Sequence, residues 1–131
     1  MHDVVAAALV REQHVLLVHR RPDRRWYPDV WDLPGGHVED GEPPLTALIR
    51  ELHEELGVHV DPPACVPVAE VPVPARSLHL RIRRVDAWRG TPVNRCPAEH
   101  DGIGWLAADR LAGLTLADPG HLALLAGLLR R

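Results

Sequence analysis

The sequence has few cysteines and no long apolar run. Cys65 and Cys96 are the only cysteines among 131 residues, and they form no CxxC pair. We therefore expect two reduced thiols and a cytoplasmic location, not a disulfide framework. No stretch approaches the roughly 18 apolar residues of a membrane-spanning helix. The N-terminal run contains Asp3 and no basic segment, so it predicts a first strand and not a signal peptide.

The chain also lacks a strong excess of either charge. Its formal net charge is −3, with 15 basic and 18 acidic residues. Proteins that coat nucleic acids are usually clearly basic, so we expect no nucleic-acid polymer as partner. Hydrophobic residues make up 46% of the chain, and its length fits one domain over residues 1–131. No repeat or linker divides it, and the composition is compatible with a monomer or a homodimer.

Hydrophobic periodicity predicts alternating strands and helices. We expect a hairpin of strands at 4–10 and 14–19, a loop over 20–34, irregular chain over 37–43 and a strand at 78–88. Residues 58–74 contain many prolines, which lack the amide donor, and so predict an edge strand with loops. A loop over 90–101, a short strand at 103–106, a helical turn at 107–111 and a helix at 119–131 complete the chain.

Residues 36–58, GHVEDGEPPLTALIRELHEELGV, are the most informative segment. Leucine or isoleucine stands at positions 45, 48, 49, 52 and 56, which is the spacing of one helix face. The helix should begin near Pro43 or Pro44, because proline is tolerated in the first turn. Gly57 is a suitable residue to end it.

Three glutamates of this helix lie close to its apolar face. Glu51, Glu54 and Glu55 are spaced so that like charges repel, and a divalent cation would remove that repulsion. Without a metal, we expect raised carboxylate pKa values. Arg50 can bind a neighbouring carboxylate bidentately. The alternatives are a solvated helix face for the glutamates and an ordinary surface pair between Arg50 and Glu54.

The segment resembles the signature of the Nudix hydrolases, G-x5-E-x7-R-E-U-x-E-E-x-G-U, where U is a bulky aliphatic residue. All specified positions are filled, by Gly36, Glu42, Arg50, Glu51, Leu52, Glu54, Glu55, Gly57 and Val58. The lead-in WDLPGG at 31–36 and the segment IGWL at 103–106 are also similar to small MutT-like members. The resemblance implies an α/β fold, namely an α/β/α sandwich around a mixed sheet.

The resemblance also implies a reaction and a set of site residues. The reaction is hydrolysis of a nucleoside diphosphate linked to another group X, with Mg²⁺ or Mn²⁺. The implied metal ligands are Glu51, Glu54, Glu55 and the carbonyl group of Gly36. The candidate catalytic residues are Glu42, Arg50, Glu51 and Glu54, and a glutamate of the helix or of a late loop would activate the attacking water. For Glu42, an interaction with the helix dipole is an alternative to a supporting role.

A further acidic ligand or base is implied near the late tryptophan. Some MutT-like members carry the acid directly before this tryptophan, where this chain has Gly104 before Trp105. We therefore expect Glu99, in preference to Asp101, to be the additional metal ligand or base. An ordinary solvated loop is the alternative.

Nucleotide binding requires cations for phosphate and a surface for the base. The loop at 20–31 offers both, in Arg20, Arg21, Arg24, Arg25, Trp26, Tyr27 and Trp31. Stacking on an aromatic side chain contributes about 1–3 kcal/mol per base. For Trp31 and Trp105, burial in the core is the alternative. Asp118 lies where some MutT-like members place a polar residue that reads the base, and the nine histidines show no spacing typical of zinc.

Three functions are compatible with these residues. The first is a metal-dependent nucleoside triphosphate pyrophosphohydrolase of MutT type. The second is hydrolysis of ADP-ribose, a nucleotide sugar or a dinucleoside polyphosphate. Pro72 and Pro74 bracket the proline of ADP-ribose members, but the segment is rich in prolines, and the tyrosine of dinucleoside polyphosphate members is missing there. The third is a non-catalytic Nudix binding module, which usually loses part of the signature.

Overall fold

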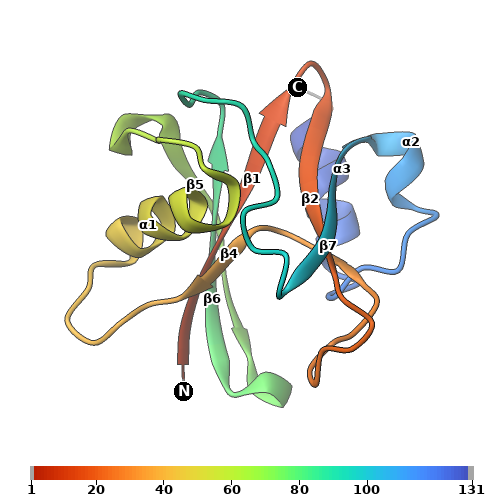
Figure 1. Cartoon of the computed structure of the whole chain (residues 1–131), viewed down its shortest axis with the longest axis horizontal. Coiled ribbons are helices and arrows are strands. Elements are labelled where there is room, and N and C mark those ends of the chain that lie inside the picture. The colour runs from red at the N-terminus through yellow and green to blue at the C-terminus, as the bar shows by residue number, and fades with distance from the viewer. Residues whose placement is uncertain (1, 130–131) are drawn as a thin grey trace.

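A mixed sheet of seven strands forms the centre of the protein (Figure 1). The computed structural model describes residues 2–129. The strands are β1 (His2–Arg11), β2 (His14–Arg20), β3 (Trp31–Asp32), β4 (Gly35–His37), β5 (Cys65–Val73), β6 (Leu78–Val85) and β7 (His100–Ala107). The helices are α1 (Pro44–Leu56), α2 (Ala108–Leu111) and α3 (His121–Leu129), with 3-10 turns at Pro62–Ala64 and Pro74–Arg76. The predicted α/β class is confirmed.

The strands β1 and β2 separate soon after the turn that joins them. They pair only through Val10–Val15 and Arg11–His14. Beyond that point β4 pairs with β1 and β3 pairs with β2, so residues 31–37 run between the separated strands. On the other side of β1 lies β6, parallel to it, with β5 at the edge, and β7 pairs with β2. This separation leaves room for a site beside β1.

The alternation of side chains along β1 builds one core on each face of the sheet. Val5, Ala7 and Leu9 pack toward α1, whereas Ala6 and Ala8 belong to the cluster that contains α2 and α3. Successive residues of a strand point to opposite faces, so one apolar strand can serve both cores. The result is the expected sandwich, with α1 on one face and α3 on the other (Figure 1).

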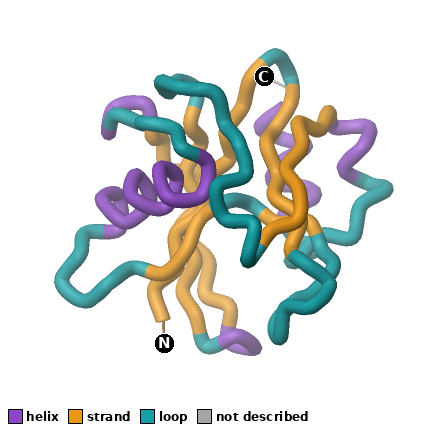
Figure 2. Tube along the Cα trace, in the orientation of Figure 1, coloured by secondary structure: helices purple, strands orange, loops and turns teal. Residues whose placement is uncertain are grey.

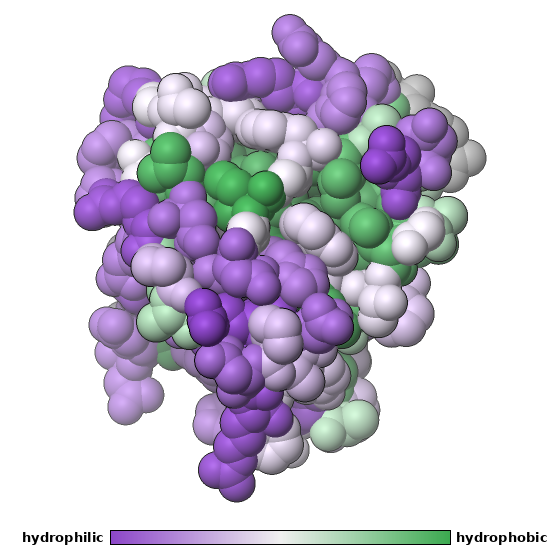
Figure 3. Space-filling view, turned by 45° about the vertical axis from the view of Figure 1, so that its right-hand side comes forward, coloured by the Kyte–Doolittle hydropathy of each residue, from purple (hydrophilic) through white to green (hydrophobic). Residues whose placement is uncertain are grey.

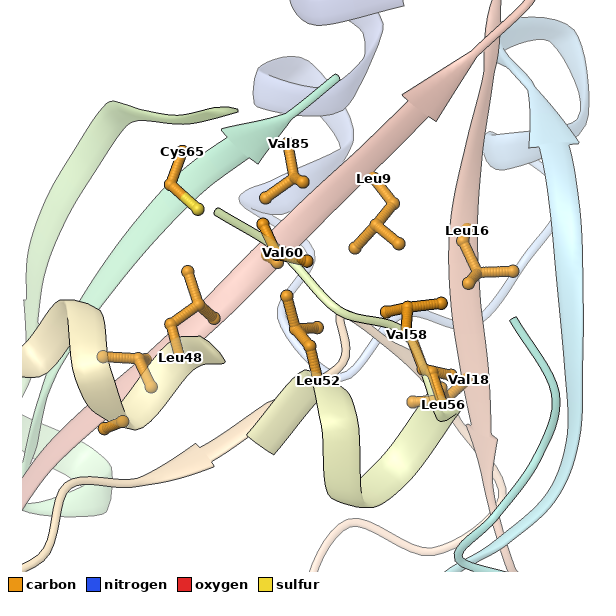
Figure 4. Packing of buried hydrophobic residues seen from close by; sticks show 13 residues of the cluster. Leu9, Leu16, Val18, Leu48, Leu52, Leu56, Val58, Val60, Cys65 and Val85 are labelled. Carbon is orange, nitrogen blue, oxygen red and sulfur yellow. The ribbon is translucent and has the colours of Figure 1, made fainter. Parts of the chain in front are cut away.

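The helix α1 follows the sequence prediction at both ends. Pro44 is its first residue, and Gly57 ends it in the left-handed conformation with φ 75°. The Gly57 amide donates to the His53 carbonyl at 3.0 Å. In Figure 4, Leu48 and Leu52 of α1 lie in the same cluster as Leu9 of β1.

Several predicted elements are confirmed and others need correction. The strands β1, β2 and β6, the edge strand β5, the turn α2 and the helix α3 all appear where the sequence predicts them. The predicted loop over 20–34 was wrong in part, because its end forms β3 against β2, and β4 extends the chain to His37. The strand predicted to reach residue 88 ends at Val85. Arg89 instead exchanges backbone hydrogen bonds with His59. Residues 130–131 of the predicted last helix lie outside the described residues.

The surface carries some large apolar side chains. Figure 3 shows a mostly hydrophilic face with hydrophobic residues gathered across its upper half. The alternative that Trp105 is buried in the core was wrong. The Trp105 side chain is 37% exposed and stacks on Trp88, with 5.9 Å between the ring centroids. Trp31 is partly buried against the α3 side of the sheet. None of the helices in residues 2–129 has both the length and the apolar character needed to cross a membrane.

Substitution of Leu52 by alanine tests the contribution of α1 to the core. Leu52 is fully buried, so Leu52→Ala should lower the free energy of unfolding by about 2–5 kcal/mol in urea denaturation. The matched control is Thr46→Ala on the exposed side of α1, which should change it by less than about 0.5 kcal/mol. Equal effects of the two substitutions would contradict the packing described for α1.

Candidate active site

A cavity of about 750 Å³ opens where the separated strands meet α1. This volume lies within the range of about 300–1,000 Å³ that is usual for small-molecule sites. Residues from β1, β4, α1, the loop after β2 and the start of β7 line it. Glu51 and Glu55 lie on its α1 side, whereas Trp26 and Tyr27 come from the loop. The cavity therefore joins Glu51 and Glu55 of the signature to the predicted nucleotide-binding loop, whereas Glu42 and Glu54 are not among its lining residues.

Arg50 connects the carboxylates of the signature. Its Nε and Nη2 donate to the two carboxylate oxygens of Glu42 at 2.9 and 3.0 Å. Its Nη1 donates to Glu51 at 2.9 Å and to Glu54 at 3.3 Å, and Nη2 also donates to the His37 carbonyl at 3.1 Å. The pair with Glu54 is thus one contact of several. Bidentate geometry fixes both partners in orientation.

The pairing with Arg50 also indicates the structural role of Glu42. The Arg50 hydrogen bond lowers the pKa of the Glu42 carboxyl group, and the same contact raises the pKa of Arg50. The carboxylate of Glu42 also accepts the Glu39 amide at 3.1 Å. Glu42 therefore braces Arg50 from outside the helix, which accounts for an acidic residue at this position without the helix dipole.

Glu51 and Glu55 are the buried acids of the cluster. Glu55 is only 6% exposed, and burial, followed by the charge of Glu51, raises its pKa to about 9. Burial also raises the pKa of Glu51, opposed by Arg50. The Gly35 amide donates to Glu55 at 2.9 Å. Raised values were expected for a carboxylate cluster without metal, because burial and like charges disfavour the ionised form.

Gly36 lies directly under the carboxyl group of Glu51. A Cβ atom at position 36 would stand 2.4 Å from the carboxyl carbon of Glu51, so a side chain here would displace that carboxylate. Because β4 is paired with β1 at this point, the backbone has little freedom to move away. The glycine of the signature therefore leaves room for the Glu51 carboxylate against β4.

The chain between β6 and β7 brings Glu99 to the same cavity. Figure 2 shows this loop passing beside the end of α1, where Val93 and Arg95 donate their amides to the carbonyls of Leu56 and Glu55. Glu99 lines the cavity and lies 3.6 Å from Arg24. Asp101 instead contacts His19 at 2.6 Å. Of the two acids only Glu99 is among the lining residues, and its role as a metal ligand or base stays a prediction.

Only some of the other predicted substrate-binding residues line the cavity. Arg20, Trp26 and Tyr27 line the cavity, and Arg20 holds the loop by donating to the carbonyls of Tyr27 and Trp26 at 2.9 and 2.7 Å. Arg21 pairs with Asp23 at 2.9 Å and does not line the cavity. Asp118 is also outside the lining. Its carboxylate accepts the Gly120 amide and faces His121.

The sequence reasoning missed several lining residues, among them Asp32, Arg76 and His121. Burial raises the pKa of Asp32, and the side chain of Arg76 lies over the Tyr27 ring at 4.0 Å. An acid inside the lead-in WDLPGG was a signal for Asp32. Arg76 and His121 had none, because they approach the cavity only through the tertiary fold.

The donor set of the cluster suits a hard divalent cation. The carboxylates of Glu51, Glu54 and Glu55 and the carbonyl of Gly36 are all oxygen ligands, which Mg²⁺ and Mn²⁺ prefer. Glu54 is 55% exposed and so remains accessible. The unfavourable burial of Glu55 beside Glu51 is the kind of electrostatic cost that a cation relieves. The residues present therefore fit the metal that the signature implies.

Comparisons with known proteins agree with this geometry. Residues 1–128 match the model of the NUDIX domain. The chain is 33% identical to the CTP pyrophosphohydrolase of Escherichia coli (strain K12) over 125 residues, 95% of this chain and 89% of the relative. It is 31% identical to the 8-oxo-dGTP diphosphatase of Proteus vulgaris over 86 residues, 65% of this chain and 77% of the relative. The crystal structure of a MutT NUDIX hydrolase from Burkholderia pseudomallei superimposes with a TM-score of 0.77 at 27% identity, covering 96% of this chain and 95% of that one.

Replacement of Glu55 tests the buried acid through the pH dependence of stability. The folded pKa of about 9 lies above the ordinary value of 4.5, so the metal-free folded state binds the extra proton between these values. The free energy of unfolding should therefore fall as pH rises from about 5 to about 9, by up to about 1.4 kcal/mol per pH unit. Urea denaturation of Glu55→Gln in the presence of EDTA should lack the decrease in the free energy of unfolding that Glu55 causes.

The comparison of wild type with Glu55→Gln isolates one group, because the other acids are common to both. Saturating Mg²⁺ should flatten the wild-type profile, since the cation replaces the proton. Parallel profiles of the two metal-free proteins between pH 5 and 9 would show that Glu55 ionises normally.

Proposed function

This chain belongs to the Nudix family of acid-anhydride hydrolases, and from this premise we propose that it is a Mg²⁺- or Mn²⁺-dependent nucleoside triphosphate pyrophosphohydrolase of MutT type. The observation that carries the proposal is the glutamate cluster of α1, in which Arg50 holds Glu51 and Glu54 while Glu51 and Glu55 line a nucleotide-sized cavity. A regulator without catalysis would have no need of this arrangement.

In this proposal some residues hold and orient the metal ligands, and another accepts the proton of the attacking water. The ligands would be Glu51, Glu54, Glu55 and the carbonyl of Gly36. When bound, the cation neutralises phosphate charge and makes water a better nucleophile. Glu42 and Arg50 keep these carboxylates in position. Glu99 faces the cluster from the late loop and can accept a proton from the attacking water, because it lines the same cavity.

The other end of the cavity suits a nucleoside. Trp26 is 65% exposed and Tyr27 carries Arg76 on its ring, so aromatic surface and positive charge lie together. Arg20 and Arg24 also line the cavity and add positive charge that can attract the phosphates of a substrate. The Asp32 carboxyl group, whose pKa burial raises, lines the cavity and can hydrogen-bond to a base.

The names of the similar proteins favour a nucleoside triphosphate over the other substrate classes. The Escherichia coli relative is a CTP pyrophosphohydrolase and the Proteus vulgaris relative an 8-oxo-dGTP diphosphatase. Both names describe nucleoside triphosphates with different bases. The triphosphate is therefore the substrate class that we propose, and ADP-ribose, nucleotide sugars and dinucleoside polyphosphates are the alternatives.

A substrate panel with Mg²⁺ and with Mn²⁺ tests the reaction. Wild-type protein should convert at least one nucleoside triphosphate to the monophosphate and pyrophosphate. Glu54→Gln should lower kcat by about 10²–10⁴-fold, because it removes one carboxylate of the cluster. Glu12→Gln, at the exposed β1–β2 turn, is the matched control and should retain full activity. Full activity of Glu54→Gln would exclude the proposed site.

Asp32 and Asp118 compete for the role of reading the base. Asp32 lines the cavity, whereas the Asp118 carboxylate is engaged by the turn before α3. Asp32→Asn should change the ratio of kcat/KM between purine and pyrimidine triphosphates by about tenfold or more. Asp118→Asn should leave that ratio nearly unchanged. The reverse result would return base recognition to Asp118.

A further inference from the structure

A second cluster of ligand atoms stands at the wall of the cavity, where the chain enters β7. Cys96, Glu99 and His100 each offer one atom, and these atoms all lie within 4.8 Å of one another. We propose that these three side chains form a separate binding site for Zn²⁺ or a similar thiophilic divalent ion. A thiol and an imidazole distinguish it from the oxygen-only cluster of α1.

The backbone of this turn is firmly held. The Cys96 carbonyl accepts the amides of Glu99 and His100, each at 3.0 Å. The Asn94 side chain closes the turn from outside, because its Nδ2 donates to the His100 carbonyl at 2.8 Å and its Oδ1 accepts the Cys96 amide at 3.1 Å. The Arg95 amide anchors the turn to the Glu55 carbonyl at 2.8 Å. The three side chains are thus gathered before any ion binds.

The imidazole of His100 is the second observation that points to a ligand. The residue is only 4% exposed, and within residues 2–129 its ring nitrogens make no hydrogen bond to a protein group. His100 lines the cavity, and an imidazole nitrogen is a common metal ligand. A bound ion would give this nearly buried imidazole a partner on the cavity side.

The ligand chemistry selects the ion. Zinc binds Cys sulfur at about 2.3 Å and His nitrogen or carboxylate oxygen at about 2.0–2.2 Å, so ligand atoms in a tetrahedral shell stand about 3.5 Å apart. The cluster must therefore contract by about 1 Å, which the flexible side chain of Glu99 can provide. Three protein ligands leave one position open. Because the thiolate is the form that binds metal, the ion displaces the proton of the Cys96 thiol when it binds.

The site shares Glu99 with the proposed catalytic machinery. When an ion holds this carboxylate with Cys96 and His100, the carboxylate is withdrawn from the glutamate cluster of α1. Zn²⁺ should therefore inhibit the Mg²⁺-dependent reaction, a consequence that rests on the proposed function. Binding of the ion itself does not depend on that function and can be tested alone.

Co²⁺ titration of the metal-free, fully reduced protein provides the test, because a cobalt–thiolate bond produces a near-ultraviolet charge-transfer absorption. Wild type should develop this absorption to a 1:1 end point and lose it on addition of one equivalent of Zn²⁺. Cys96→Ser should show none, and its Zn²⁺ affinity in a chelator competition should fall at least about tenfold. Cys65→Ser replaces the other, distant thiol and should behave as wild type.

Glu51→Gln separates this site from the catalytic cluster. It should lose hydrolysis if the proposed function is right and still show the full cobalt–thiolate absorption. Absence of the absorption in wild type, or its persistence in Cys96→Ser, would overturn the second site whatever the hydrolysis assays show. Asn94→Ala keeps all three ligands and should weaken Zn²⁺ binding, since it releases the turn that gathers them.

Discussion

The packing of ionisable carboxyl groups around Arg50 is the constraint on which the rest of the site depends. One guanidinium contacts Glu42, Glu51 and Glu54, and among the described residues it is the only cation hydrogen-bonded to them. Glu55 is buried, and within residues 2–129 its carboxyl group accepts a hydrogen bond only from the Gly35 amide. One positive charge cannot balance four acids, so the folded protein keeps part of this charge as protons. A divalent cation from solution resolves the same imbalance, which links the stability of the cluster to its chemistry.

The fold brings three separate segments to this cluster. The separation of β1 from β2 admits residues 31–37, and β4 places Gly36 against Glu51. The end of α1 at Gly57 exposes carbonyls that hold the loop before β7. That loop then presents Glu99 to the cavity. The helix therefore has two structural roles, because it carries the acids on one side and anchors the opposing loop at its end.

The sequence predicted most of what depends on local spacing and little of what depends on distant pairing. The limits of α1, its buried leucines and its glutamates follow from helical periodicity, so they were predictable. The strands β3 and β4 are too short to show a period. The positions of Asp32 and Arg76 depend on the packing of the segments on either side of the cavity. Glu99 and Asp101 are two residues apart, and the pairing of β7 with β2, which gives Asp101 to His19, decides which one faces the cavity.

Mg²⁺ binding measured by calorimetry in buffers of different ionisation heat tests the central claim most directly. Mg²⁺ is preferred by oxygen ligands, so it reports on the glutamate cluster and not on Cys96. If the cation replaces a proton held by the buried acids, binding near pH 7.5 should release about one proton in wild type and clearly less in Glu55→Gln. Tight binding with no proton release, or the same release in both proteins, would contradict the account.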